Sequence, residues 1–222
     1  MMHTVFTEQY PPPPVRTEEI LRYAGARDIT PELSALLENT LQEANSCLSC
    51  KVCWQKLPVC IHNADVDMTF AKIRSEQLSH HLKNCSQIVL FAATVGIGLD
   101  RLIARYGKTS PAKALLLQAI GAERIEALCD LFSEKIKNDA ANEELHTTSR
   151  FSPGYGDLPL ELQRDIFRTL NCSRIGLALN DSLMMSPSKS VTAIIGIGNR
   201  CHDTATGCSG CTKTDCIHRR RL

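Results

Sequence analysis

Apolar residues recur at helical intervals in several stretches of the chain, as expected where one face of each helix is buried. Most of these stretches begin with a residue type that commonly starts helices, either threonine or serine as an N-cap, such as Thr30, or proline in the first turn. The longest stretch follows Ser110 and Pro111 and runs to residue 137. We therefore predict helices that begin at Thr17, Pro31, Ser75, Leu99, Pro111 and Pro159.

Runs of apolar residues of strand length indicate where the sheet lies. Residues 88–94 are continuously apolar, which is typical of a strand buried on both faces at the centre of a sheet. Residues 175–180 and 191–197 are predicted as further strands, and residues 47–61 as a cysteine-bearing loop and strand. Because helices and strands come in uneven clusters without a regular βαβ repeat, the pattern favours an α+β domain.

Length and composition set the domain organisation. The chain has 222 residues, of which 43% are hydrophobic, which is enough to bury the core of one domain with a small appendage. We predict a flexible, proline-rich arm over residues 1–15, with Pro11 to Pro14 extended as polyproline. Residues 16–198 then form the α+β domain, and residues 199–222 form a cysteine-rich tail.

Charge and hydropathy exclude several classes of protein. The formal net charge is +1 with acidic and basic residues interspersed, so no broad basic surface is available to bind nucleic acid. No apolar run approaches the roughly 20 residues that span a bilayer, so no membrane association is expected. The first 16 residues lack the apolar segment of a signal peptide. The 11 cysteines are therefore expected to be reduced thiols or metal ligands in a cytoplasmic protein.

A stiff turn over residues 150–155 is the strongest candidate for a ligand site. Pro153 fixes its own φ, and Gly154 lets the chain reverse or lie close to a ligand without a Cβ in the way. Arg150 can bind a carboxylate through its forked guanidinium, and Tyr155 offers a ring face and a hydroxyl. The pair suits an adenosyl compound that carries an amino acid, although a turn that merely ends a strand fits the same residues.

The cysteines of the tail have the spacing of metal ligands. The pattern C-x6-C-x2-C-x4-C suits an iron-sulfur cluster or a structural zinc ion, which spacing alone does not separate, and a disordered reduced tail is the alternative. A second set, C-x2-C-x2-C-x6-C, is less persuasive because its last spacing is not that of a typical ferredoxin. The other cysteines are predicted to be small buried residues. The first set is Cys201, Cys208, Cys211 and Cys216, the second is Cys47, Cys50, Cys53 and Cys60, and the others are Cys85, Cys129 and Cys172.

Several of these segments, in the same order and at similar spacing, resemble the activation domain of cobalamin-dependent methionine synthase. They are residues 150–155 (Arg-Phe-Ser-Pro-Gly-Tyr) with the helix after them, residues 175–191, and residues 88–100 with the helical block to residue 137. The resemblance covers roughly residues 70–198 of a chain much shorter than the whole synthase. It implies a twisted antiparallel sheet surrounded by helices, in a stand-alone relative of that domain.

The resemblance also implies a function. Domains of this family bind S-adenosylmethionine and present its methyl group to cobalamin whose cobalt has become inactive Co(II), while a donor supplies one electron. The cobalamin would be held by a partner, methionine synthase or another corrinoid protein, so the chain would be a component of a methyltransferase system. By resemblance, Arg150 contacts the ligand and Glu126 matches an acidic position on the preceding helix. Pro153, Gly154 and Tyr155 would shape the pocket.

Two other functions remain open at this point. A non-enzymatic iron-sulfur or zinc protein, with a redox or scaffold role, could have kept the fold and lost the nucleotide site. Activation of a different corrinoid protein is the other alternative, and only the partner distinguishes it from activation of methionine synthase. A cluster in the cysteine-rich tail could itself supply the electron.

Overall fold

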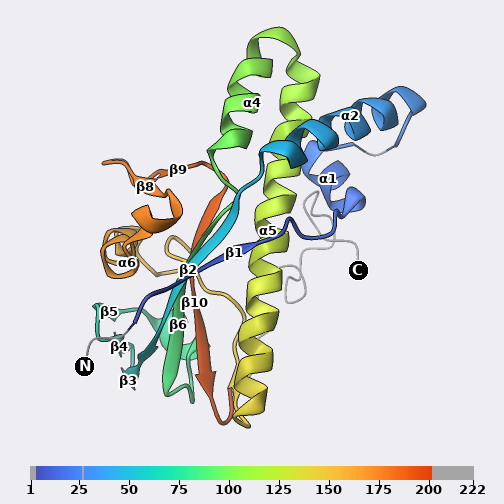
Figure 1. Cartoon of the computed structure of the whole chain (residues 1–222). Helices are drawn as coiled ribbons and strands as arrows, with labels where there is room; N and C mark the ends of the chain where they lie inside the picture. Colours follow the sequence, from blue (N-terminus) through green and yellow to red (C-terminus); the bar gives the residue numbers. More distant parts are fainter. Residues whose placement is uncertain (1–3, 27, 202–222) are drawn as a thin grey trace.

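The computed structural model describes residues 4–26 and 28–201 of the chain. Its centre is a five-stranded sheet with the strand order β1-β2-β6-β10-β7, in which every neighbouring pair is antiparallel. Helices surround the sheet, so the predicted α+β class with an antiparallel sheet is confirmed (Figure 1). The strands of this sheet are β1 (Phe6–Tyr10), β2 (Cys50–Pro58), β6 (Gln87–Thr94), β7 (His146–Thr147) and β10 (Ser190–Gly198).

Both faces of the sheet are buried, which explains the uninterrupted apolar run of β6. Val89, Phe91 and Ala93 belong to one hydrophobic cluster, whereas the alternate residues Leu90 and Ala92 belong to the other. Successive side chains of a strand point to opposite faces, so a strand covered on both sides needs apolar residues throughout. The prediction of a central buried strand is confirmed, because β6 is the middle strand of the sheet.

Four helices cover the first face. The longest, α5 (Pro111–Asn142), runs along the sheet, and the other three pack toward its upper end in Figure 1. The predicted N-cap Thr30 accepts a hydrogen bond from the backbone N–H of Leu33 at 3.3 Å. In the part of the chain that the structure describes, no helix combines the length and the apolar composition that crossing a membrane requires. The other three helices are α1 (Thr17–Ala24), α2 (Pro31–Cys47) and α4 (Ile97–Thr109).

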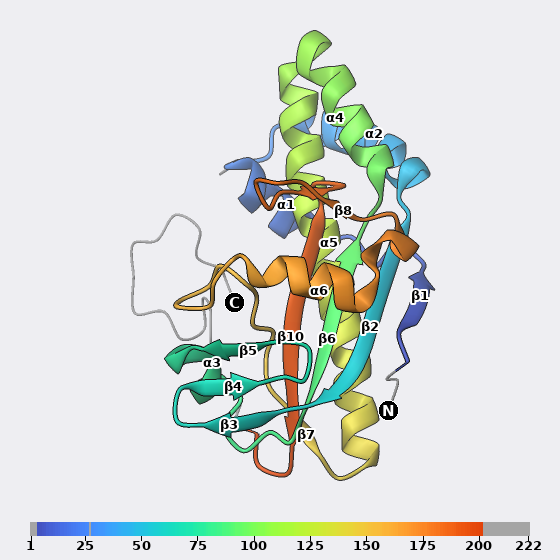
Figure 2. The same cartoon turned by 90° about the vertical axis from the view of Figure 1, so that its left-hand side faces the viewer.

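Shorter elements cover the second face (Figure 2). Helix α6 (Leu162–Leu170) crosses the sheet and is followed by the 3-10 helix η1 (Cys172–Ile175), while α3 (Glu76–His81) packs beside a small three-stranded sheet. The predicted N-cap of α3, Ser75, accepts a hydrogen bond from the Leu78 N–H at 3.0 Å. The remaining strands are β3 (Cys60–His62), β4 (Asp65–Asp67), β5 (Lys72–Arg74), β8 (Ala178–Leu179) and β9 (Met185–Ser186).

The strand predicted over residues 175–180 is shorter than expected. Ile175 ends η1, and Gly176 adopts a left-handed conformation with a φ of 80°. The strand begins only at Ala178, where β8 pairs with β9. Over so few residues an apolar run does not distinguish a strand from a buried helical turn, which is why the boundary was misplaced.

The prediction of a flexible arm is wrong for Phe6–Tyr10, which form the edge strand β1 and pair with β2. Phe6 stacks on Trp54 with ring centroids 4.7 Å apart. The Glu8 carboxylate accepts hydrogen bonds from the Trp54 indole N–H at 2.7 Å and from Lys135 of α5. Prolines remove backbone donors only where they stand, so the residues before them are free to pair at the edge of a sheet.

Close packing explains a glycine in the first turn of α4. A Cβ at Gly98 would lie 2.4 Å from the carbonyl oxygen of Cys47, the last residue of α2. Any side chain at this position would force the two helices apart. The glycine therefore sets the distance at which α2 and α4 meet above the sheet.

Candidate functional site

The candidate turn, residues 150–155, lies between β10 and α6. Phe151 exchanges both backbone hydrogen bonds with Ile194 of β10, at 2.9 and 2.8 Å. His81, buried at the end of α3, contacts the Ser149 carbonyl oxygen at 2.8 Å, and its ring centroid lies 5.0 Å from that of Phe151. The start of the turn is therefore fixed by the sheet on one side and by α3 on the other.

The turn itself is closed by backbone hydrogen bonds. The Gly154 N–H donates to the Leu158 carbonyl oxygen at 2.9 Å, and the Leu158 N–H donates to the Tyr155 carbonyl oxygen at 3.0 Å. Gly154 has a φ of 88°, a conformation that residues with a Cβ rarely adopt. Tyr155 has 68% of its surface exposed, so its ring is accessible to a ligand.

Asp157 joins the turn to α3. Its carboxylate accepts hydrogen bonds from the Ser75 hydroxyl and from the backbone N–H of Glu76, the latter at 2.6 Å. The Ser75 hydroxyl and these backbone amides hold the pKa of Asp157 below its ordinary value. The carboxylate therefore stays ionised at the start of the helix, where a negative charge is stabilised.

Arg150, at the start of the turn, packs against α5. Its Nη2 atom donates to Glu126 Oε2 at 3.1 Å and to Asp130 Oδ1 at 2.7 Å. The structure thus brings Arg150 together with Glu126, the acidic residue named by the resemblance, and adds Asp130 one turn further along α5. Burial alone would lower the pKa of Arg150, but Cys129 and the two carboxylates outweigh it and raise the pKa. The guanidinium therefore stays charged.

Asp130 connects Arg150 to a second arginine, Arg16, which precedes α1. The Arg16 Nη1 atom donates to Asp130 Oδ2 at 2.9 Å, and Arg16 Nε donates to Glu123 at 3.1 Å. Asp130 is thus shared by two arginines that are far apart in the sequence, while Glu123 pairs with Arg16 and Glu126 pairs with Arg150. The N-terminal segment is consequently part of the surroundings of Arg150.

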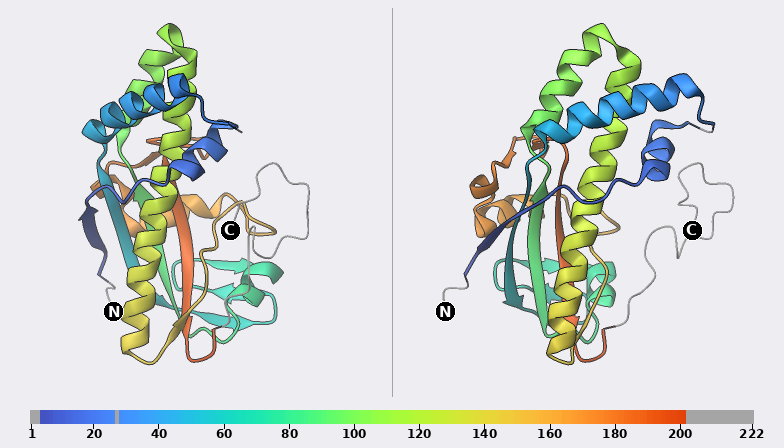
Figure 3. Two further views of the ribbon diagram at one scale, coloured as in Figure 1. Left: turned by 90° about the vertical axis from the view of Figure 1, so that its right-hand side faces the viewer. Right: turned by 45° about the vertical axis from the view of Figure 1, so that its right-hand side comes forward.

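Arg124 holds the proline-rich segment against α5, which this segment crosses on its way to α1 (Figure 3). The guanidinium pairs with Glu123 and donates to the carbonyl oxygens of Pro13 and Pro14, the latter at 2.8 Å. Glu123 and Arg124 are fully buried. Neither residue was predicted from the sequence, although a charged pair on the apolar stripe of a helix is the signal that indicates them.

The cluster presents both signs of charge at the start of the turn that leads to the exposed Tyr155. A guanidinium carries five N–H donors, more than the two contacts made by Arg150 Nη2 require. Glu126 and Asp130 have 32% and 39% of their side chains exposed, so they can accept hydrogen bonds from an ammonium group. These charges complement the zwitterionic amino-acid end of an adenosyl compound.

Comparison with known proteins decides the family. Residues 74–208, more than half of the chain, match the family model described as vitamin B12 dependent methionine synthase, activation domain. The chain belongs to this family. The matched part of the activation domain includes α5 and the turn at Arg150, whereas Arg16 and the proline-rich segment precede it.

A comparison with solved structures supports the same fold for the activation domain. One similar structure, described as the MetH reactivation domain bound to AdoHcy, gives a TM-score of 0.64 at 15% sequence identity. The similarity covers 92% of this chain and 80% of that chain, so it extends to the elements before residue 74. A search of curated proteins found no match.

The second cysteine set does not form one cluster in this activation domain. Cys50 belongs to the hydrophobic cluster under α5, whereas Cys53 belongs to the cluster on the opposite face of the sheet. An odd separation along a strand places two side chains on opposite faces, so Cys47, Cys50, Cys53 and Cys60 cannot ligate one ion. Within residues 4–26 and 28–201, no group of three or more His, Cys, Asp or Glu side chains could hold a metal ion.

The first cysteine set lies mostly outside the described residues. Cys208, Cys211 and Cys216 fall in that part of the chain, so metal binding by the tail stays a prediction. Cys201 is described and is 8% exposed, next to Cys85. Of the cysteines predicted to be buried, Cys129 and Cys172 are buried and Cys85 is half-buried.

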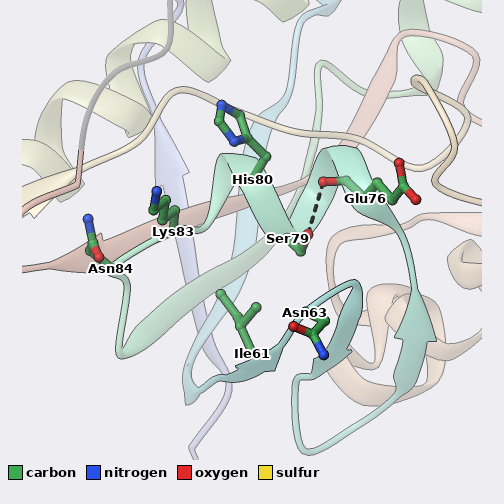
Figure 4. A pocket seen from close by; sticks show the side chains of 7 residues that line it. All are labelled: Ile61, Asn63, Glu76, Ser79, His80, Lys83 and Asn84. Carbon is green, nitrogen blue, oxygen red and sulfur yellow. Dashed lines mark hydrogen bonds between the residues drawn. The ribbon is translucent and has the colours of Figure 1, made fainter.

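An open cavity of about 460 Å³ lies between α3 and the β3–β4 hairpin, away from the Arg150 turn (Figure 4). Helix α3 contributes Glu76 and His80, Lys83 lies just after this helix, and the hairpin contributes Ile61 and Asn63. The polar side chains among these five are exposed to solvent and carry mixed charges. No residue of the Arg150 turn lines this cavity, which is therefore not part of the candidate site.

Proposed function

We propose that this activation domain binds S-adenosylmethionine at the Arg150 turn and presents its methyl group to cobalamin held by a partner. The proposed partner is methionine synthase, whose inactive cobalamin would be returned to the methylated form. The observation that carries the proposal is the position of Arg150, between two carboxylates of α5 and a stiff turn that leads to an exposed Tyr155.

Charge complementarity supports this choice of ligand. The α-carboxylate of S-adenosylmethionine would bind Arg150, and its α-ammonium would bind Glu126 and Asp130. Tyr155 would pack its ring against the adenosyl group. AdoHcy, named in the description of the similar MetH reactivation domain, is the compound that remains after S-adenosylmethionine has lost its methyl group.

The proposed reaction requires positioning rather than acid-base catalysis. The S–CH₃ bond of the ligand breaks, the bonding electron pair stays on sulfur, and AdoHcy leaves. The methyl group goes to cobalt, which receives one electron from a separate donor. No side chain of this activation domain needs to act as a nucleophile or base, so its residues contribute by holding the sulfonium methyl in line with the partner's cobalt.

Calorimetric titration with S-adenosylmethionine and with AdoHcy tests the site. Tyr155→Ala should weaken binding about 10-fold, the loss of roughly 1.4 kcal/mol of ring contact. Arg150→Ala should weaken binding about 30-fold, which corresponds to about 2 kcal/mol for a charge-assisted hydrogen bond. Arg168→Ala is the matched control, because its side chain is 80% exposed on α6 and lies outside the site.

The two site variants separate loss of binding from loss of folding. Arg150 also anchors the turn to α5, whereas the exposed ring of Tyr155 can be removed without opening the core. Unchanged binding in both variants would remove the turn from the site. Failure of the parent protein to bind either compound, even beside cobalamin-loaded methionine synthase, would favour a non-enzymatic role. Transfer of labelled methyl to the synthase, given a reductant, identifies the partner.

A further inference from the structure

Two cysteines from distant parts of the sequence meet where the described part of the chain ends. Cys85 lies between α3 and β6, and Cys201 lies just beyond β10. Their sulfur atoms are 2.8 Å apart, well inside the non-bonded separation of two sulfur atoms. Cys201 is also the first cysteine of the tail, so this contact lies where the tail begins, which we call the root of the tail.

Two glycines of β10 make room for this thiol pair. A Cβ at Gly196 would lie 2.6 Å from the Cys85 sulfur, and a Cβ at Gly198 would lie 3.1 Å from the Cys201 sulfur. At Gly198 the Cβ would also come within 2.3 Å of the Asn84 carbonyl oxygen. The strand therefore passes the thiol pair without side chains on that side.

Backbone contacts hold both cysteines in place. The Cys85 N–H donates to the Leu82 carbonyl oxygen at 2.9 Å, which closes the last turn after α3. The next residue, Ser86, donates its N–H to Ile197 of β10 at 3.0 Å and so extends the β6–β10 ladder up to the pair. The approach of the two sulfurs thus follows from strand pairing rather than from a mobile loop.

We propose that Cys85 and Cys201 form a reversible disulfide bond, made by exchange with a low-molecular-weight disulfide such as oxidised glutathione. The Cys85 thiolate attacks one sulfur of the small disulfide and releases one glutathione thiol. The Cys201 thiolate then attacks the mixed disulfide and releases the second. Two protons and two electrons pass from the protein to glutathione, and one S–S bond is exchanged for another.

Partial exposure distinguishes this pair from a second one in the same face of the sheet. Cys53 of β2 and Cys172 of η1 also contact each other, but they are 0% and 1% exposed. Cys85 is half-buried, so a small disulfide can reach its sulfur. Cys201 is only 8% exposed, so the exchange is slow and needs incubation for hours.

The bond would tie the root of the tail to the sheet. It would close a loop over residues 85–201, which contains α5, the Arg150 turn and α6. A cross-link over so long a loop removes much conformational freedom from the unfolded chain, so the melting temperature should rise by about 10 °C.

The test uses the full chain with the other tail thiols removed, as C208S/C211S/C216S. The protein is incubated with oxidised glutathione, free thiols are alkylated, and peptides are mapped by mass spectrometry. A peptide pair joined through Cys85 and Cys201 is expected, together with a melting temperature that rises by about 10 °C and returns on treatment with dithiothreitol. Cys60→Ser, at an exposed cysteine, should keep the shift, and Cys85→Ser should abolish it.

Three results would overturn the proposal. The first is alkylation of Cys85 after oxidation to the same extent as before. The second is glutathione left on Cys85 or Cys201 without a bond between them. The third is a Cys85–Cys201 bond that forms only after unfolding, which would show that the pair is closed to small disulfides in the native protein.

Discussion

Replacement of the buried Arg124 by methionine is the sharpest test of how the N-terminal segment is held. Methionine fills much of the space of the arginine stem but donates no hydrogen bonds. The change removes the contacts to Glu123 and to the carbonyl oxygens of Pro13 and Pro14. Glu123 would remain fully buried, with Arg16 as its remaining cationic partner.

The expected loss follows from these contacts. Removal of one partner from a buried ion pair costs about 3–5 kcal/mol. Because Arg16 still donates to Glu123 at 3.1 Å, we expect the lower end, about 3 kcal/mol. For a domain of this size, the melting temperature should fall by about 6–12 °C. The double variant Glu123→Gln/Arg124→Met should lose less, because no unpaired charge is left buried.

Urea unfolding followed by fluorescence measures this loss. The chain has one tryptophan, Trp54, which lies against β1, so its emission also reports whether β1 stays on the sheet. Arg105→Met is the matched control. Arg105 is 70% exposed, and its ion pair with Glu43 is long, at 3.9 Å. A loss below about 1 kcal/mol for Arg124→Met, or a larger loss in the double variant than in the single one, would refute the reasoning.

Three further outcomes follow from packing and charge. Gly98→Ala should lower the melting temperature by several degrees, because its Cβ would lie 2.4 Å from the Cys47 carbonyl oxygen. Gly107→Ala, where a Cβ meets open space, should raise the melting temperature slightly. Calorimetry that finds equal melting temperatures for the two variants would contradict the packing argument. Burial would raise the pKa of Glu8, but its hydrogen bonds outweigh burial and lower it. Its stabilisation is therefore present above the unfolded pKa and lost as the pH falls through the folded pKa, so Glu8→Gln should flatten that part of the stability curve in urea titrations. Asp157→Ala should speed amide hydrogen exchange in the first turn of α3, and unchanged exchange would show that Asp157 does not cap it.

Local signals predicted much of the fold from the sequence. Thr30 and Ser75 each cap a helix through contacts within a few residues, so their effect can be seen in the sequence itself. The apolar run of β6 reports burial on both faces, whatever its neighbours are. The family resemblance named Arg150 and Glu126, which the structure places in contact at 3.1 Å.

Contacts between distant parts of the sequence were missed. Strand β1 depends on its pairing with β2, and proline composition gave no indication of this partner. Arg16 meets Glu123 and Asp130 only because the chain crosses α5, and no local spacing encodes that crossing. The cysteine spacing in β2 suggested metal ligands that lie together. Side chains alternate between the two faces of a strand, however, so residues that are close in sequence are separated in space.

The position of β10 in the sheet has a consequence for synthesis on the ribosome. It is the last of the five strands to emerge, yet it lies between β6 and β7 rather than at an edge. After β6 has left the ribosome, roughly 100 more residues must be translated before its second neighbour arrives, which takes about 5–20 s. During that interval one hydrogen-bonding side of an apolar strand is open to pairing with other chains until β10 arrives.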